Sequence, residues 1–330
     1  MTLRHVTLRQ LRAFEAVARN LSFSRASREL HLTQPGISMQ VKKLEEQVGL
    51  PLFERIGRKT FLTEAGSELH RHSRVIAQQL RDAGEALAAR KGLTQGRLHI
   101  TMVSTAKYFA PPLLARFLKQ HPGVSVKLSA NNRETVLRQL ADNEVDFAIM
   151  GRPPQRMETV AEAFARHPHV MIAATDHPLA GKRRIPLERL ARETFLIREP
   201  GSGTRGLLER LFAERGLPLN VSMEIASNET IKQAVIAGMG ISFLSLHTIE
   251  LELKTGRLAV LDVQGLPIVR DWHVVHLAAK QLSPIALAFK EFLLTQAAKL
   301  MEAPAGGARP AAKRSAKRTR EMRAGFQNTC

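Results

Sequence analysis

Apolar residues recur at helical intervals near the start of the chain, and these intervals define three helices. In "TLRQLRAFEAVAR" (7–19) one side of the predicted helix carries Leu8, Leu11, Phe14 and Val17. Ser22 can cap a second, short helix that runs to Leu30. A tight connection at 31–33 then leads to a third helix. Helix, short helix, brief turn and longer helix is a helix-turn-helix pattern.

The third helix begins unusually, at "TQPGIS", where a proline and a glycine stand side by side. Thr33 is a good N-cap residue, and Pro35 lies in the first turn, where its missing N–H costs nothing. Leu32 and Ile37 are spaced as a hydrophobic staple. We expect Gly36 where a Cβ would clash with the preceding helix or with a phosphate. The segment therefore predicts a helix with a sharply defined start.

The two sides of this helix differ in character. At about 100° per residue, one narrow arc faces the core and carries Ile37, Val41, Leu44 and Val48. The opposite side carries Pro35, Met39, Lys42 and Lys43, with Ser38 on the flank. Such a low, basic profile can enter the major groove of DNA.

The next segment, "LPLFERIGRKTFLTEAG", predicts a small basic wing. Strand-compatible residues flank Gly57, and three cations, Arg55, Arg58 and Lys59, cluster there. Thr63 can cap a long helix over 64–91.

A repeating pattern runs along this long helix. Its spacing of 4-3-4-3-4 is carried by Leu69, Ser73, Ile76, Leu80, Ala83 and Leu87. Sustained spacing of this kind is typical of a coiled-coil dimer. The alternative is a helix that packs on its own domain.

Residues 92–96 resemble a hinge, and beyond them strand-like runs alternate with amphipathic helices. The strand-like runs are 97–103, 124–130, 146–151, 169–175, 194–199, 241–246 and 271–278. The alternation predicts an α/β domain over 97–302, large enough for two subdomains with parallel-type sheets. Residues 303–330 are rich in Ala, Gly, Pro, Lys and Arg and predict a basic disordered tail.

The net charge of the chain narrows the class of partner it can bind. The chain carries 49 basic against 30 acidic residues, a net charge of +19, and the excess is concentrated in 1–95 and 303–330. Such an excess favours a polyanionic partner, usually nucleic acid. The tail is either a non-specific DNA contact or an inert extension. One cysteine, no secretory signal and no long apolar run predict a cytoplasmic protein without a membrane partner.

The sequence resembles the LysR-type transcriptional regulators. The resemblance rests on "LRAFEAVARNLSFSRASRELHLTQPGISMQVKKLEEQVGLPLFER" followed by "LTEAG". Within that family it is similar to the regulators of RuBisCO (Calvin-cycle) operons, through "VSTAKYFAPPLLARFLKQHPGV", "NRETVLRQLADNEVDFAIMGRPP" and "REPGSGTR". Two departures from the family pattern are Ala26–Ser27, where the family commonly has two alanines, and Met39, where it often has a basic residue.

The resemblance implies a winged helix-turn-helix DNA-binding domain (1–63), a dimerising linker helix (64–91) and a two-lobed α/β effector domain like the periplasmic binding proteins. It also implies a homotetramer, built from dimers on an extended promoter site, that acts as an activator, and a small metabolite that alters DNA bending and the recruitment of RNA polymerase. A small phosphorylated or otherwise anionic metabolite is the implied signal, and no cofactor is expected. An alternative is a LysR-type regulator of another metabolic operon.

The predicted DNA contacts lie on the second and third helices and on the wing. They are Ser22, Ser24, Arg25, Thr33, Gln34, Pro35, Ser38, Met39, Lys42, Lys43, Arg55, Arg58 and Lys59. Met39 would contact a base through an apolar surface, for instance a thymine methyl. Lys43 and the wing arginines are predicted on phosphates.

The predicted effector contacts lie at strand ends and helix starts, where open α/β sheets bind ligands and helix N-termini attract anions. They are Ser104, Thr105, Lys107, Gly151, Arg152, Gly201, Ser202, Gly203, Thr204, Arg205, Ser227 and Asn228. Each could instead be a helix cap or a surface charge.

Enzymes and metal sensors fit poorly. "GMG" at 238–240 follows a helix and precedes a strand, the reverse of a dinucleotide loop, and "GSGTR" lacks the ending of a phosphate-binding Walker loop. "HPH" at 167–169 is predicted as a loop, and His70 and His72 point away from each other on one helix. The remaining alternative class is a solute-binding sensor that acts through a protein partner.

Overall fold

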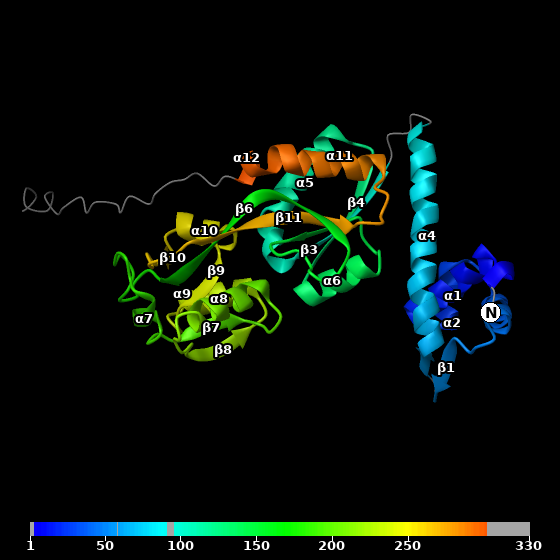
Figure 1. Cartoon of the computed structure of the whole chain (residues 1–330), viewed down its shortest axis with the longest axis horizontal. Helices are drawn as coiled ribbons and strands as arrows, with labels where there is room; N and C mark the ends of the chain where they lie inside the picture. Colours follow the sequence, from blue (N-terminus) through cyan, green and yellow to red (C-terminus); the bar gives the residue numbers. More distant parts are fainter. Residues whose placement is uncertain (1–2, 58, 91–95, 302–330) are drawn as a thin grey trace, which may run out of the picture.

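The computed structural model describes residues 3–57, 59–90 and 96–301, arranged as an N-terminal unit, a long helix and an elongated C-terminal domain (Figure 1). The N-terminal unit is built from η1 (Leu3–His5), α1 (Leu8–Asn20), α2 (Phe23–Glu29), α3 (Gln34–Val48) and the antiparallel hairpin β1 (Phe53–Ile56)–β2 (Lys59–Leu62). The predicted helix-turn-helix and wing are therefore present.

The core of the N-terminal unit follows the helical period. Phe14 of α1 and the predicted inner face of α3 are buried, and Phe53 of the wing contacts the Phe14 ring at 5.4 Å between centroids. Full burial of such side chains stabilises a small domain by about 1.5–3 kcal/mol each. The wing is thus fixed against the same core that orients α3.

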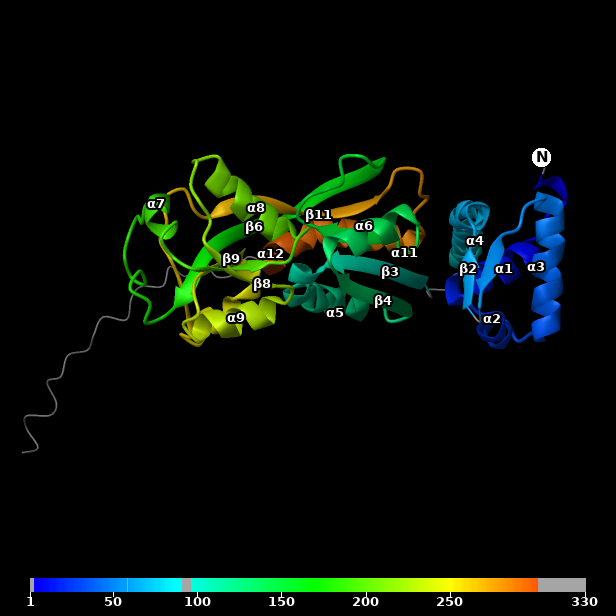
Figure 2. The same ribbon diagram turned by 90° about the horizontal axis from the view of Figure 1, so that it is seen from below.

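The long helix α4 (Glu64–Arg90) follows the wing directly and stands beside the first part of the C-terminal domain (Figures 1 and 2). Its predicted apolar seam divides in two. Leu69 packs on the core of the N-terminal unit and Ser73 is buried. Ile76, Leu80 and Leu87 are exposed, by 41, 49 and 64%. Only this later part of the seam is open to a partner.

The C-terminal domain has two lobes (Figure 2). The first contains β3 (Gly96–Val103), η2 (Ser104–Tyr108), α5 (Ala110–Gln120), β4 (Val124–Asn131), α6 (Arg133–Ala141), β5 (Phe147–Met150), α11 (Pro284–Phe292), η4 (Leu293–Ala297) and α12 (Ala298–Met301). The second contains α7 (Leu187–Leu190), β7 (Phe195–Arg198), α8 (Gly203–Ala213), β8 (Val221–Ile225), α9 (Asn228–Ile236), β9 (Ser242–Ser245), η3 (Leu246–Thr248), α10 (Glu250–Lys254) and β10 (Leu258–Val260).

Two long strands join the lobes, β6 (Thr159–Ala174) and β11 (Ile268–Leu277), which pair antiparallel along their length. The main sheet has the order β10-β6-β11-β5-β3-β4, and β9 also pairs with β6. Its β3, β4 and β5 are parallel, whereas β7 and β8 form a separate parallel pair. The predicted parallel character therefore holds for part of each lobe, and the crossing strands make the main sheet mixed.

The prediction of a loop at 167–169 is wrong, because β6 runs through it. Pro168 pairs with Val269 of β11 on one side, and the pairing of β6 with β9 begins only at His169. Among the described strands, β6 thus has an open edge at Pro168, where the missing N–H is tolerated. A strand over 169–175 was expected, and it is the second half of a longer one.

The described residues contain no helix with the length and apolar character needed to cross a membrane. The tail at 303–330, the hinge residues 92–95 and Arg58 of the wing lie outside the described residues.

Candidate functional site

The first site is the outer face of α3, and the head of this helix shows how it is oriented. The Thr33 hydroxyl accepts a hydrogen bond from the N–H of Gly36 at 3.2 Å, and Pro35 lies in the first turn, both as predicted. A Cβ at position 36 would lie 3.1 Å from the Thr33 hydroxyl oxygen. Glycine therefore keeps room for the cap itself, rather than for the preceding helix as expected.

The predicted groove-facing side chains of α3 are accessible. Pro35, Met39, Lys42 and Lys43 are exposed, Met39 by 53%, and Ser38 is half-buried. These residues form a continuous face that no described residue covers, which is the requirement for entering a groove.

The second helix and the wing support this face. The Ser22 hydroxyl accepts from the N–H of Arg25 and so caps α2, and the Ser24 hydroxyl donates to the Gln34 side chain at 3.0 Å. The Arg55 guanidinium lies 5.7 Å from the centroid of the Phe23 ring, and Lys59 is exposed. Ser22 and Ser24 thus have structural partners, while Arg25, Arg55 and Lys59 keep accessible charges.

The second site is a cleft between the lobes, partly open to solvent. Clefts between lobes are common sites for small ligands. Its lining residues are Val103, Ser104, Thr105, Asn131, Asn132, Arg133, Gly151, Arg152, His167, His169, Arg198, Glu199, Ser202, Gly203, Thr204 and Arg270.

Most of these residues lie just beyond the carboxyl ends of parallel strands. Ser104 follows β3, Asn132 follows β4, Gly151 follows β5 and Glu199 follows β7. The crossing strands β6 and β11 supply the remaining wall. The carboxyl ends of the parallel strands meet at one crevice, which is where open α/β sheets bind ligands.

The cleft is strongly positive. Four arginines line it, Arg133, Arg152, Arg198 and Arg270, against one carboxylate, Glu199. Burial and then the charge of Arg152 lower the pKa of Arg133, and burial followed by Arg210 and Arg152 lowers that of Arg270. These guanidiniums repel one another, and a bound anion would relieve the repulsion.

Arg198 is the central cation of the cleft, and sequence reasoning missed it. Its side chain is 4% exposed and donates to both carboxylate oxygens of Glu199, at 2.7 and 2.8 Å. It also donates to Asn228 and, across the cleft, to the Ser104 hydroxyl at 3.1 Å. Arg198 therefore ties the two lobes together at the cleft.

A second polar contact joins the lobes at the rim. The Tyr108 hydroxyl donates to Glu229 at 2.5 Å, and Lys232 binds the same carboxylate at 2.9 Å. Burial and then the Glu229 carboxylate raise the pKa of Tyr108. The tyrosine thus stays neutral and keeps its donor role.

The predicted effector residues divide into two groups. Those that line the cleft are Ser104, Thr105, Gly151, Arg152, Ser202, Gly203 and Thr204. Those that do not are Lys107, Gly201, Arg205, Ser227 and Asn228. Asn228 nevertheless supports the site through its contact with Arg198.

The residues outside the lining have other partners. Arg205 pairs with Glu209 and Glu224 at 2.7 and 2.8 Å, and Lys107 lies 3.8 Å from Glu229. The Ser227 hydroxyl caps α9, and Gly201 has φ +80°, which the turn before α8 requires. The turn precedes α8 as predicted, but Arg205 does not line the cleft, and its guanidinium donates to the carbonyl oxygen of Arg198 at 3.3 Å.

The start of α8 is open to the cleft. Ser202 occupies its N-cap position without making a side-chain cap hydrogen bond, and Gly203 and Thr204 of the first turn line the cavity. The positive end of the helix dipole therefore adds to the arginine charges. Within the described residues, no group of His, Cys, Asp or Glu side chains is placed to hold a metal ion.

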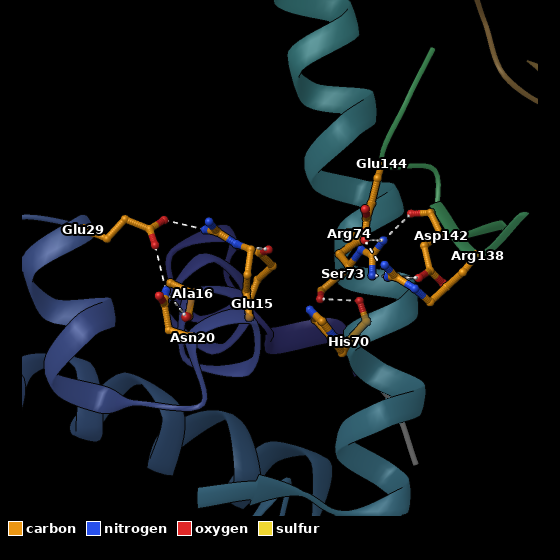
Figure 3. A network of polar contacts seen from close by, with 11 residues as sticks. Glu15, Ala16, Asn20, Glu29, His70, Ser73, Arg74, Arg138, Asp142 and Glu144 are labelled. Carbon is orange, nitrogen blue, oxygen red and sulfur yellow. Dashed lines mark hydrogen bonds and ion pairs between the residues drawn. The ribbon is translucent and has the colours of Figure 1, made fainter. Parts of the chain in front are cut away.

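A third set of contacts joins α4 to the first lobe (Figure 3). Arg74 donates to the Asp142 carboxylate at 3.1 Å and to Glu144 at 2.6 Å, and its side chain is only 16% exposed. Arg138 approaches the same two carboxylates at 3.6 and 3.4 Å. One turn earlier on α4, the His70 ring meets the Phe14 ring edge-on. The network thus connects the C-terminal domain to the core of the N-terminal unit.

A helix-turn-helix with an exposed basic face, a long linker helix and a positively charged cleft between two lobes together define a ligand-responsive DNA-binding regulator. The family comparisons agree. The LysR family "Bacterial regulatory helix-turn-helix protein" matches residues 8–67 and "LysR substrate binding domain" matches residues 91–298. The chain belongs to the LysR family of DNA-binding transcriptional regulators and is not an enzyme.

Relatives of known role resemble the chain over most of its length. It is 53% identical to a RuBisCO operon transcriptional regulator of Allochromatium vinosum, over 90% of this chain and 98% of that protein. It is 50% identical to the HTH-type transcriptional regulator CfxR of Cupriavidus necator, over 93% and 97%.

Solved structures resemble it as well. The Synechocystis PCC6803 CcmR regulatory domain in complex with 2-PG is 44% identical and covers 61% of this chain and 96% of its own, with a TM-score of 0.59. A full-length OxyR variant of Pseudomonas aeruginosa shares the fold at 23% identity, with 91% and 99% covered and a TM-score of 0.74.

Proposed function

We propose that this protein regulates carbon-fixation (RuBisCO) operon genes, chiefly as an activator, in response to a small anionic metabolite. The Allochromatium vinosum relative, which is 53% identical to this chain, is a RuBisCO operon transcriptional regulator. The anionic character of the metabolite is inferred from the cleft, which is lined by four arginines and one carboxylate. Phosphate and carboxylate groups match guanidinium donors and an open helix N-terminus.

Binding to RuBisCO operon promoter DNA tests this function. Fluorescence anisotropy should show tighter binding of the full chain to that promoter than to a scrambled sequence, and an affinity that changes when 2-PG or a related phosphorylated metabolite is added. Affinity should also fall steeply with salt, because phosphate contacts release counterions. Equal binding to both sequences, with weak salt dependence, would favour a sensor that acts through a protein partner.

Base-facing and phosphate-facing residues should differ in their effects. Ser38→Ala and Met39→Ala are expected to change sequence preference by about 1–3 kcal/mol at the contacted base pair. Lys43→Ala should weaken binding to all sequences alike and reduce the salt slope by about one unit. Competition binding with a library of single-base operator variants separates these outcomes. A uniform loss for both kinds of change would contradict the groove assignment.

The proposed assembly uses the exposed seam of α4. A homodimer formed through Ile76, Leu80 and Leu87 would place two α3 helices on two half-sites of promoter DNA. Pairs of such dimers would form a homotetramer that contacts RNA polymerase at the promoter. With chromosomal DNA as the partner, we place the protein in the cytoplasm.

We infer that α6 carries the signal from the cleft to the DNA-binding unit. Arg133 at its start lines the cavity, and Arg138 near its end shares the carboxylates bound by Arg74. A shift of α6 on anion binding would therefore move α4 through these ion pairs. The nine-residue helix is short and well packed, so it transmits displacement as a unit.

Arg74→Ala should uncouple the two sites. We expect metabolite affinity to change by less than about threefold, whereas the metabolite-induced change in DNA affinity should fall by about fivefold or more. Isothermal titration calorimetry and anisotropy measure the two quantities. Arg71→Ala is the matched control, because Arg71 is exposed and pairs with Glu68 of the same helix. Equal responses of the two variants would exclude this route.

A further inference from the structure

His167 lies in the wall of the cleft with its polar atoms unused. Its side chain is 4% exposed, it lines the cavity, and neither ring nitrogen has a hydrogen-bond partner among the described residues. Buried polar groups are almost always satisfied, so this ring points to a molecule that binds there.

Packing holds the ring in place. The Trp272 indole stacks on it with centroids 3.8 Å apart and planes at 17°, and the His169 ring lies 4.1 Å away. Gly151 completes the slot, because a Cβ there would lie 2.7 Å from Nδ1 of His167. The orientation of the ring therefore needs no hydrogen bond, and because Nδ1 packs against Gly151, Nε2 is the nitrogen left for a ligand.

The surroundings of His167 are cationic or neutral. His169 lies on the same strand, Arg270 opposite it on β11, His247 on η3 with its ring centroid 6.1 Å away, and Arg152 in the same cavity wall. Burial, followed by His169, His247 and Arg270, holds the pKa of His167 well below 6.5. The ring is therefore neutral at pH 7 in the unliganded protein, with one donor and one acceptor nitrogen.

We propose that His167 binds the anionic metabolite directly and takes up a proton when the anion enters the cleft. This inference rests on the proposed function. Negative charge beside the ring favours its protonated form, in which both nitrogens donate. The pKa of His167 is therefore higher in the complex than in the free protein, and binding consumes a proton between the two values. Affinity rises as pH falls through the pKa of the complex and levels off below that of the free ring.

Neighbouring histidines are less suited to this role. Nδ1 of His169 already lies 3.2 Å from the carbonyl oxygen of His167, so one of its nitrogens is engaged. His247 does not line the cavity. Among the histidines of the cleft, His167 is the one whose two nitrogens both lack a partner among the described residues.

Sulfate is the probe, because its own charge stays constant near neutral pH. Any proton taken up on binding is therefore bound by the protein. Isothermal titration calorimetry of the full chain with sodium sulfate, in two buffers of different ionisation enthalpy, counts the protons taken up. We expect uptake approaching one proton for each cleft. Affinity should rise by up to about tenfold per pH unit as the pH falls from neutral toward the pKa of the free ring, which lies well below 6.5. Sulfate binding without proton uptake would overturn the inference but not the anion site, whereas absence of binding would overturn both.

Variants identify the residue. His167→Gln should abolish proton uptake and weaken sulfate binding, while His273→Gln, a β11 residue outside the cavity lining, should retain both. Gly151→Ala should weaken sulfate binding by displacing the ring. If His167→Gln fails to fold, proton uptake by the wild-type chain and sulfate binding by Gly151→Ala still test the proposal. Uptake that persists in His167→Gln but disappears in His169→Gln or His247→Gln would overturn the assignment.

Discussion

Arg198→Ala is expected to weaken anion binding by about 100-fold or more and to remove the metabolite response of DNA binding. The guanidinium is the most buried charge of the cleft, and each of its charge-assisted hydrogen bonds is worth about 1.5–3 kcal/mol. Its removal also leaves the Glu199 carboxylate without its counter-ion in the cavity, where it would repel an anion. Calorimetric titration of 2-PG into the full chain measures the first effect, and promoter anisotropy with and without 2-PG measures the second.

Arg205→Ala is the matched control for Arg198. Arg205 lies in the first turn of α8, which follows the strand that Arg198 ends, and its guanidinium pairs with Glu209 and Glu224 outside the cavity lining. We expect anion affinity to change by no more than about threefold in this variant, since exposed pairs contribute about 0–1 kcal/mol. Arg198→Lys keeps a positive charge in the cleft and provides a second variant if Arg198→Ala does not fold. If Arg205→Ala lost the response and Arg198→Ala kept it, the cleft would be assigned to the wrong arginine.

Leu80→Glu is expected to break the proposed dimer and to weaken operator binding by about 100-fold or more. Leu80 is 49% exposed in the middle of the open part of the seam, between Ile76 and Leu87. A pair of carboxylates facing each other at this position opposes helix association. Without the dimer, each α3 binds its half-site alone and the gain from linked binding is lost. Analytical ultracentrifugation and promoter anisotropy measure the two consequences.

Val75→Glu provides the same chemical change on a different side of α4. Val75 is 39% exposed and lies about 140° around the helix from Leu80. We expect this variant to remain dimeric and to bind the operator. Dissociation by both variants would show that general loss of apolar surface, and not the seam, controls assembly. A dimeric Leu80→Glu with normal operator affinity would exclude the seam as the interface.

The N-terminal unit could be predicted closely because its signals are local. The cap at Thr33, the proline in the first turn and the buried side of α3 all follow from neighbouring residues within the same helix. The packing of the linker helix was harder to predict. Its 4-3 spacing extends from Leu69, but the first part of the pattern is used by the N-terminal unit of the same chain. Periodicity shows that a face is apolar and does not show which surface covers it.

The cleft could be predicted only in part because it is assembled from distant segments. The turn before α8 was predicted as an anion site, and which of its residues face the cavity depends on how the lobes meet. Arg198 was missed because it ends a buried strand, although the carboxyl-end rule that selected Ser104 applies to it equally. His167 was missed because its strand was read as a loop.

We expect an anion between the lobes to change how α3 engages promoter DNA. A DNase I footprint of the full chain on the DNA upstream of its operon, with and without 2-PG and related phosphorylated metabolites, measures this change. We predict a protected region whose extent changes with the metabolite for the wild-type chain and for Arg205→Ala, and stays fixed for Arg198→Ala. A footprint that ignores every metabolite, or one that still responds in Arg198→Ala, would contradict it.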